Sequence, residues 1–253
     1  MQKVWPESPE ELIDAQHALA TPLATAIAPA TPPPWRPPPE PYAIGACVVV
    51  FPRGQGGRGA RGDPAWAAAA VLHRRRVVSE STIATVAAGP YVPGLLALRE
   101  GPCLEAALRA LPRAPDVLLV DATGRDHPRR AGLALHLGAV TELPTVGVTH
   151  RPLCADGPWP EDKRGASSPL NLDGECVGAW LRTRAGARPL AIHPGWRTTL
   201  EVAIDVVLCA THGHRTPEPI RRARRLARLA RSESVDTQRL PGARPGKSGV
   251  QRA

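Results

Sequence analysis

The order of apolar and polar positions along the chain predicts strands and helices in alternation. Nearly continuous apolar runs at 43–51 and 116–121 contain many β-branched residues, which is typical of strands buried inside a sheet. Further strands are predicted at 66–72, 76–85, 145–149, 175–183 and 189–193, helices at 94–111, 130–137, 198–209 and 218–231, and polar loops at 53–63 and 152–169. Three consecutive β segments followed by alternating helices and strands indicate an α/β domain whose mixed sheet is covered on both faces.

The two ends of the chain differ from this central region. Residues 8–27 have apolar positions at helical spacing behind Ser8 and Pro9, which suit an N-cap and a first helical turn. The proline-rich residues 29–41 predict an extended connector of polyproline type, and the Pro, Gly and Ser content of 232–253 predicts a disordered basic tail. We therefore expect an N-terminal helix and connector over 1–41, a folded domain over 42–231 and a tail over 232–253.

Charge is distributed unevenly along the sequence. The chain has 32 Lys and Arg against 23 Asp and Glu, which gives a net charge of +9 and a pI of about 10.2. Residues 212–253 hold 11 of the basic and 3 of the acidic groups, so nearly all of the excess lies near one end. Such a segment favours contact with a polyanion such as nucleic acid, and a solubilising tail is the alternative interpretation.

Several protein classes are disfavoured by what the sequence lacks. No run of roughly 18 apolar residues indicates a membrane span, and the N-terminus lacks the charged-then-apolar order of a signal peptide. The cysteines are odd in number and include no C-x-x-C pair, which argues against a disulfide framework and a zinc ribbon. We expect a cytoplasmic protein that acts as a monomer without contact to membranes.

Two positions suggest chemistry by their local context. Asp121 ends a buried strand next to a turn, where a carboxylate can bind a divalent cation, although capping of the turn is an equally good interpretation. Tyr91 lies between Pro90 and Pro93, which fix the backbone and would suit an aromatic wedge in a base stack, or simple packing at a loop–helix junction. Arginines recurring over 221–231 fit a solvated helix face or a phosphate-binding face equally well.

A series of motifs resembles the endonuclease V family in order and spacing over roughly residues 8–230. The motifs are Pro90-Tyr91-Val92-Pro93-Gly94, Arg99-Glu100-Gly101-Pro102, Val120-Asp121 with Gly124, His127-Pro128-Arg129-Arg130, Pro144-Thr145-Val146-Gly147-Val148, Pro194-Gly195-x-Arg197 and Arg215-x-Pro217-Glu218-Pro219. The resemblance implies an RNase H-like mixed sheet flanked by helices. It also implies a DNA-repair nuclease that uses Mg²⁺ or Mn²⁺, recognises hypoxanthine in DNA or inosine in RNA, and cleaves the second phosphodiester bond 3′ to the deaminated base.

The resemblance assigns roles to individual residues. Glu100 and Asp121 match the catalytic, metal-binding carboxylates, and Tyr91 with Pro90 and Pro93 matches the wedge that parts the strands. The other expected nucleic-acid-binding residues of the family motifs are His127, Arg129, Arg130, His150 and Arg197. Further basic residues of the core that we expect at the nucleic acid are Arg53, Arg58, Arg61, Arg99 and Arg125.

Departures from the family pattern affect the expected metal site. Cys47 stands where the family has an aspartate, Trp196 where it has a histidine, and His150 where it has a lysine. A thiol has a pKa of about 8.5 and is a soft ligand that suits Mg²⁺ poorly. Trp196 is expected to fill space that a phosphate or water would occupy. Two hypotheses follow: a nuclease with weak metal binding, or a non-catalytic relative that binds DNA or RNA without cleaving it.

Overall fold

The computed structural model describes residues 5–20, 33–53 and 59–239 of the chain. The helices are α1 (Pro9–Ala20), α2 (Leu96–Arg109), α3 (Leu133–Thr141), α4 (Leu200–Cys209) and α5 (Glu218–Arg239). The strands are β1 (Ala43–Val50), β2 (Pro64–His73), β3 (Arg76–Val86), β4 (Val117–Val120), β5 (Thr145–Thr149), β6 (Ser167–Leu172), β7 (Glu175–Leu181) and β8 (Leu190–Pro194).

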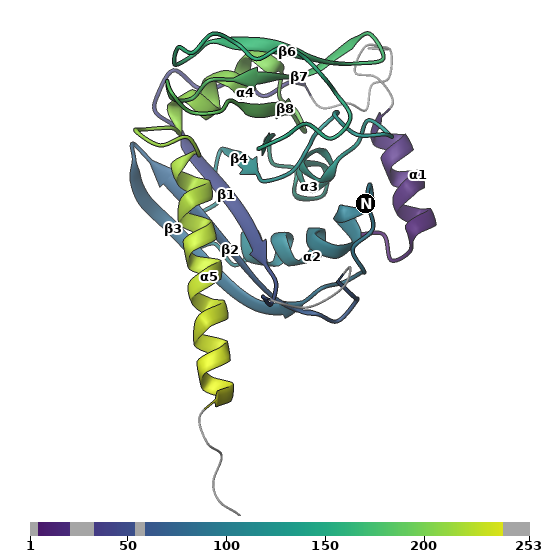
Figure 1. The fold of residues 1–253 in the computed structure, drawn as a ribbon. Coiled ribbons are helices and arrows are strands. Elements are labelled where there is room, and N and C mark those ends of the chain that lie inside the picture. Colours follow the sequence, from purple (N-terminus) through teal and green to yellow (C-terminus); the bar gives the residue numbers. More distant parts are fainter. Residues whose placement is uncertain (1–4, 21–32, 54–58, 240–253) are drawn as a thin grey trace, which may run out of the picture.

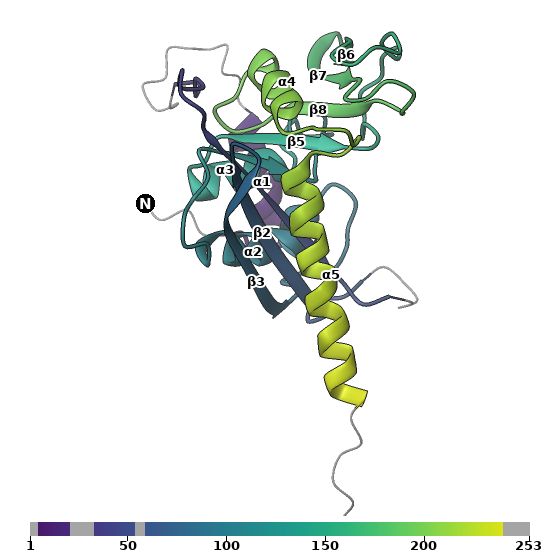
Figure 2. The ribbon, with the colours of Figure 1, turned by 90° about the vertical axis from the view of Figure 1, so that its left-hand side faces the viewer.

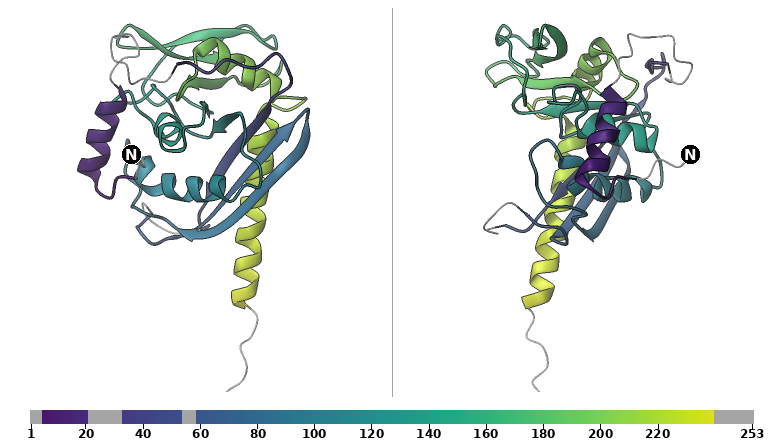
Figure 3. Two further views of the ribbon diagram at one scale, coloured as in Figure 1. Left: turned by 180° about the vertical axis from the view of Figure 1, so that it is seen from behind. Right: turned by 90° about the vertical axis from the view of Figure 1, so that its right-hand side faces the viewer.

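All eight strands form one mixed sheet in the order β3-β2-β1-β4-β5-β8-β7-β6. β1, β4 and β5 are parallel to one another, whereas β2 and β8 pair antiparallel with β1 and β5. Helices cover both faces: α5 crosses β1 and β2 on one side, and α1 and α2 lie on the other (Figures 1 and 3). The predicted mixed sheet flanked by helices is therefore confirmed.

Successive side chains of β1 point to opposite faces of the sheet and so contribute to two apolar clusters, one on each face. Cys47 faces the apolar cluster that contains Leu12 of α1 and Leu104 of α2, whereas Ala46 and Val48 face the cluster that contains α4 and α5. This orientation directs the Cys47 side chain toward α2. It also leaves α5 packed on the opposite face of the same strands (Figure 2).

The structure differs from several predicted elements. The helix predicted at 130–137 is α3, which begins at Leu133 and ends at Thr141. β6 lies partly inside the predicted loop 152–169, where Pro169 weakens the strand signal; the turn at Asp173 and Gly174 has φ values of 51° and 81°, as two-residue hairpins require. α5 continues to Arg239 instead of ending at Arg231, and the Ser234 hydroxyl in the added part accepts a hydrogen bond of 2.9 Å from the Trp66 indole of β2.

The remaining predictions concern the connectors and the tail. Residues 33–41 form neither helix nor strand, as predicted, whereas 21–32 and 240–253 lie outside the described residues. Within the described part of the chain, no helix is long and apolar enough to cross a membrane.

Candidate functional site

Two adjoining cavities lie where the parallel strands β1 and β4 end. Cys47 of β1 is the register partner of Val120 of β4, so Asp121 follows directly beyond that pair. A cavity of about 200 Å³, here called the carboxylate cavity, opens beside them. It is lined by Cys47, Val48, Val49, Leu96, Glu100, Leu104 and Asp121. The fold therefore brings together the two carboxylates assigned by family resemblance and the cysteine that departs from it.

Burial and mutual repulsion shape the charges in the carboxylate cavity. Cys47 is 1% exposed, and burial, followed by the negative charges of Glu100 and Asp121, raises the pKa of its thiol far above the usual range. Burial is also the main reason why the pKa of Glu100 rises to about 7, with a further increase from Asp121 and a smaller opposing effect of Arg99. Cys47 is consequently an uncharged thiol at neutral pH.

Arg224 of α5 pairs with Asp121 at the mouth of this cavity. Its guanidinium Nη2 lies 2.6 Å from Oδ2 of Asp121, and the two side chains are 22% and 38% exposed. An ion pair with this exposure contributes only about 0.5 kcal/mol to stability. Its larger consequence is electrostatic, because a cation that binds Asp121 meets the repulsion of a positive charge already in contact with Oδ2.

The residues of the carboxylate cavity do not fit a magnesium ion. Mg²⁺ requires near-octahedral oxygen ligands, and here one of the three candidate ligands is a neutral sulfur and another is paired with arginine. Among residues 5–20, 33–53 and 59–239, no group of three or more His, Cys, Asp and Glu side chains is arranged to hold a metal ion.

The second cavity, here called the Tyr91 cavity, has a volume of about 220 Å³ and shares Leu96 and Asp121 with the first. Its walls combine apolar side chains with a few polar groups. They are Gln16, Tyr91, Val92, Pro93, Gly94, Leu96, Ala97, Asp121, Ala122, Thr123, His127, Leu133, Thr149 and Leu153. The Tyr91 side chain is 45% exposed at its rim, and Pro90 and Pro93 are exposed beside it.

Hydrogen bonds to the Gly94 carbonyl fix the wall of the Tyr91 cavity. This oxygen accepts from Arg129 Nη2 at 2.8 Å, from His127 Nε2 at 3.1 Å and from Gln16 Nε2 at 3.1 Å. Arg129 also donates through Nε to Gln16 Oε1 at 2.6 Å, which ties α1 to the same loop. Burial lowers the pKa of His127, so the ring is neutral while it lines the cavity. His127 thus remains at the expected site, and Arg129 holds the loop in place.

Two other predicted contacts line neither cavity. Arg130 donates to the Leu172 carbonyl at 2.9 Å and to Asp173 at 3.0 Å, which ties it to the turn between β6 and β7. His150 is exposed on the surface, but partial desolvation of its ring and then the charge of Arg215 lower its pKa, while nearby Asp121 has the opposite effect.

Trp196 and Arg197 lie at the other end of the sheet. The Trp196 backbone N–H donates to Thr145 Oγ1 at 2.8 Å, and Thr145 is the first residue of β5. Asp121 follows the last residue of β4, which is parallel to β5, so the two residues lie at opposite ends of these strands. Arg197 donates to the Pro33 carbonyl at 3.1 Å. Neither residue lines a cavity described above, so the expectation that Trp196 fills a phosphate position beside the carboxylates is corrected.

Arg99 also differs from the sequence-based expectation. It is 4% exposed and donates to the Ala60 and Gly89 carbonyls and to Asp63, so it is a structural residue and not a surface contact. Arg58 lies outside the described residues. The sequence did not predict Arg224 and Gln16 as site residues. They reach the site only because α5 and α1 pack close to the end of β4, and no local sequence pattern indicates that packing.

Comparison with known proteins identifies the family and the fold of this chain. The family model described as Endonuclease V matches residues 56–225. Endonuclease V of Roseiflexus sp. is 47% identical over 138 residues, which is 54% of this chain and 62% of that protein, so the match spans less than two thirds of the relative. The crystal structure of Endonuclease V from Streptomyces avermitilis is 36% identical with a TM-score of 0.75, covering 91% of this chain and 96% of that one.

A third similar structure contains nucleic acid. This is the structure of Ciona intestinalis Endonuclease V in complex with a 24mer DNA containing an inosine followed by a ribo-adenosine. It has a TM-score of 0.69 at 20% identity and covers 90% of this chain and all of that one, so the two proteins share the fold. The family match over 56–225, the identity to the bacterial relatives and the common sheet agree. The chain belongs to the endonuclease V family.

Proposed function

We propose that this protein binds nucleic acid containing a deaminated base, hypoxanthine or inosine, and does not hydrolyse it. The observation that carries the proposal is the 2.6 Å ion pair between Arg224 and Asp121 beside the neutral thiol of Cys47. Family membership supports nucleic acid as the ligand, and the Ciona relative binds DNA that contains inosine.

The Tyr91 cavity suits an extruded base. Its apolar walls can stack on a purine, while Thr123 offers a hydroxyl group to the base edge. The Tyr91 ring stands at the entrance on a backbone whose N–H donates to the Gly59 carbonyl at 3.0 Å. A fixed, half-exposed aromatic ring beside a cavity is suited to replacing a base in the stack.

The carboxylate cavity lacks the charge for metal-assisted hydrolysis. Cys47 supplies no negative charge, and the charge of Asp121 is balanced by Arg224. A hard dication therefore gains little on leaving water. The competing function is metal-dependent cleavage of the second phosphodiester bond 3′ to the lesion, which is supported by Glu100 and Asp121 lining one cavity.

Binding selectivity tests the proposed ligand. Fluorescence anisotropy with labelled DNA and RNA oligonucleotides, each with inosine or guanosine at one position and in EDTA, should show tighter binding of inosine. Base–aromatic stacking is worth about 1–3 kcal/mol, so Tyr91→Ala should weaken inosine binding roughly 5-fold to 150-fold. Tyr91→Phe, which keeps the ring, serves as the control and should bind like wild type. Equal affinity for inosine and guanosine would refute the proposed recognition.

Metal binding tests the proposed lack of hydrolysis separately. Isothermal titration of the wild-type protein with Mg²⁺ and with Mn²⁺ should give no saturable heat. Cys47→Asp/Arg224→Ala restores a carboxylate and removes the competing cation, so we expect measurable Mn²⁺ binding, whereas Arg224→Lys keeps a cation and should behave like wild type. Circular dichroism verifies that each variant folds, and tight Mg²⁺ binding by the wild type would contradict the proposal.

A further inference from the structure

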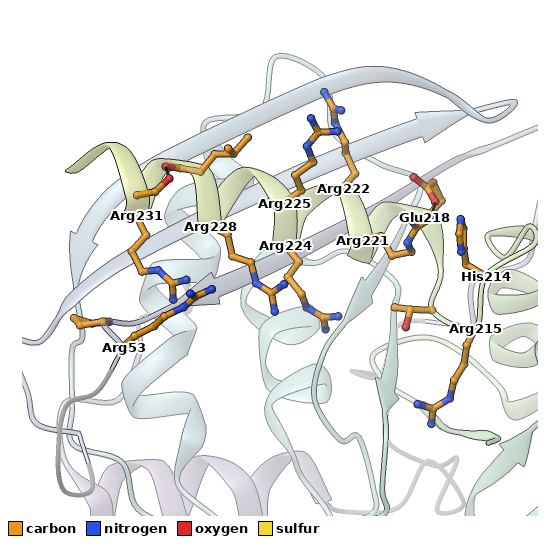
Figure 4. Close-up of a pocket in the computed structure, with 14 residues that line it drawn as sticks. Arg53, His214, Arg215, Glu218, Arg221, Arg222, Arg224, Arg225, Arg228 and Arg231 are labelled. Carbon is orange, nitrogen blue, oxygen red and sulfur yellow. Dashed lines mark hydrogen bonds and ion pairs between the residues drawn. The ribbon is translucent and has the colours of Figure 1, made fainter. Parts of the chain in front are cut away.

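An arginine-lined groove runs along α5 outside the two cavities of the candidate site. Its volume is about 1060 Å³, and eight arginines line it, together with a single acidic residue, Glu218 (Figure 4). Seven of these arginines lie on or just before α5, and Arg53 approaches from the end of the β1 segment. The groove is therefore strongly cationic.

Acidic side chains neutralise only part of this charge. Glu218 pairs with Arg221, and Glu80 of β3 pairs with Arg222. Within the described residues, Arg53, Arg225 and Arg228 make no ion pair. The groove thus holds cations that form no ion pair with an acidic side chain among the described residues.

The spacing of the arginines matches an extended polyanion. Arg221, Arg224, Arg228 and Arg231 recur every three or four residues, so they lie along one side of the helix over about 15 Å. Arg224, Arg228 and Arg231 are directed to the same side, where Arg53 extends toward Arg228 (Figure 4). Successive phosphates of one strand advance by about 3.4 Å along a duplex, so the row spans roughly four nucleotides.

The groove is continuous with the candidate site through one residue. Arg224 lines the groove and contacts Asp121, which lines both the carboxylate cavity and the Tyr91 cavity. A strand whose base enters the Tyr91 cavity can therefore continue along α5. The pKa of Arg231 is lowered, first by burial and then by the positive charges of Arg53 and Arg228. Such repulsion is expected where cations lie close together without acidic partners.

We infer that the groove along α5 binds the phosphate backbone of the nucleic acid, with Arg53 and Arg228 as direct phosphate contacts. This inference rests on the proposed function for the identity of the ligand. Backbone contacts do not depend on the base, so the groove should contribute equally to lesion-containing and lesion-free nucleic acid.

The test is the salt dependence of binding to a labelled duplex without inosine. Each phosphate contact contributes about 0.9 to the slope of log affinity against log salt concentration, so Arg53→Gln/Arg228→Gln should reduce the slope by about 1.8. The control is Arg113→Gln/Arg184→Gln, which removes two exposed arginines outside the groove and should leave the slope unchanged to within a few tenths. Both variants lose the same net charge.

The outcomes separate this inference from the proposed function. A groove variant with the wild-type slope, or a control variant with the same loss, overturns the groove as a phosphate site. A reduced slope without any preference of the wild type for inosine refutes lesion recognition and leaves the groove supported. Absence of all nucleic-acid binding by the wild type overturns both.

Discussion

Arg99→Met is the most informative perturbation of the loops around Tyr91, because one side chain joins several segments there. The Arg99 guanidinium donates to the Ala60 carbonyl at 2.8 Å, to the Gly89 carbonyl at 3.1 Å and to Asp63 at 2.8 Å. It also lies 4.1 Å from the centroid of the Phe51 ring. Since the Tyr91 N–H donates to Gly59 in the same loop, Arg99 indirectly holds the Tyr91 ring in position.

The expected loss of stability follows from these contacts. Hydrogen bonds that involve a charged group contribute about 1.5–3 kcal/mol each, and methionine keeps the apolar packing while it leaves two carbonyls without their donor. We expect Arg99→Met to lower the free energy of unfolding by about 3 kcal/mol, because part of the loss is recovered by relaxation of the loops. Asp63→Asn retains an acceptor and serves as the milder comparison.

Urea unfolding followed by tryptophan fluorescence measures this loss, and anisotropy measures the effect on inosine binding. Arg99→Met should lower the urea midpoint and also reduce the preference for inosine under conditions in which the variant is folded. A loss below about 1 kcal/mol would refute the reasoning on stability. An unchanged inosine preference in a clearly destabilised variant would refute the positioning of Tyr91 by Arg99.

Two further predictions concern buried positions near the strand ends. His193 is fully buried, and burial lowers its pKa from 6.5 to about 4. Between these two pH values the unfolded chain binds a proton at this residue and the folded protein does not. The free energy of unfolding should therefore fall by about 3 kcal/mol as the pH decreases from 6.5 to 4. His193→Gln should flatten this part of the pH profile in urea unfolding, and identical profiles would contradict the prediction. A β-carbon on Gly147 would lie 2.4 Å from the Ala122 carbonyl oxygen, so Gly147→Ala should cost about 1–3 kcal/mol by overpacking, and an unchanged thermal midpoint would contradict this.

Much of the fold can be predicted from the sequence because its central strands have strong local signals. The segment 145–149 coincides with β5, and the apolar runs at 43–51 and 116–121 contain β1 and β4. The edge strand β6 has a proline and little apolar alternation, and only the Asp-Gly pair at 173–174 indicates its hairpin. The added length of α5 depends on packing against β2, which the helix sequence itself does not reveal.

The candidate site could be predicted only where family motifs mark it. Resemblance identified Glu100 and Asp121, and the fold brings them to one cavity with Cys47. Arg224 pairs with Asp121 across more than 100 positions of sequence, so no local pattern could predict that contact. Arg99 and Trp196 were misjudged for the same reason, because their surroundings depend on tertiary packing. Arg99 is buried beside Asp63 and two carbonyls, and Trp196 lies at the start of β5.

Cleavage of an inosine-containing oligonucleotide by excess wild-type protein, in Mg²⁺ and in Mn²⁺, tests most directly whether this family member binds without hydrolysis. We predict that the labelled strand is bound and stays intact in both metals, while Cys47→Asp/Arg224→Ala forms product at the second phosphodiester bond 3′ to inosine. Product from the wild-type protein that disappears with Asp121→Ala would contradict the proposal and establish a metal-dependent nuclease.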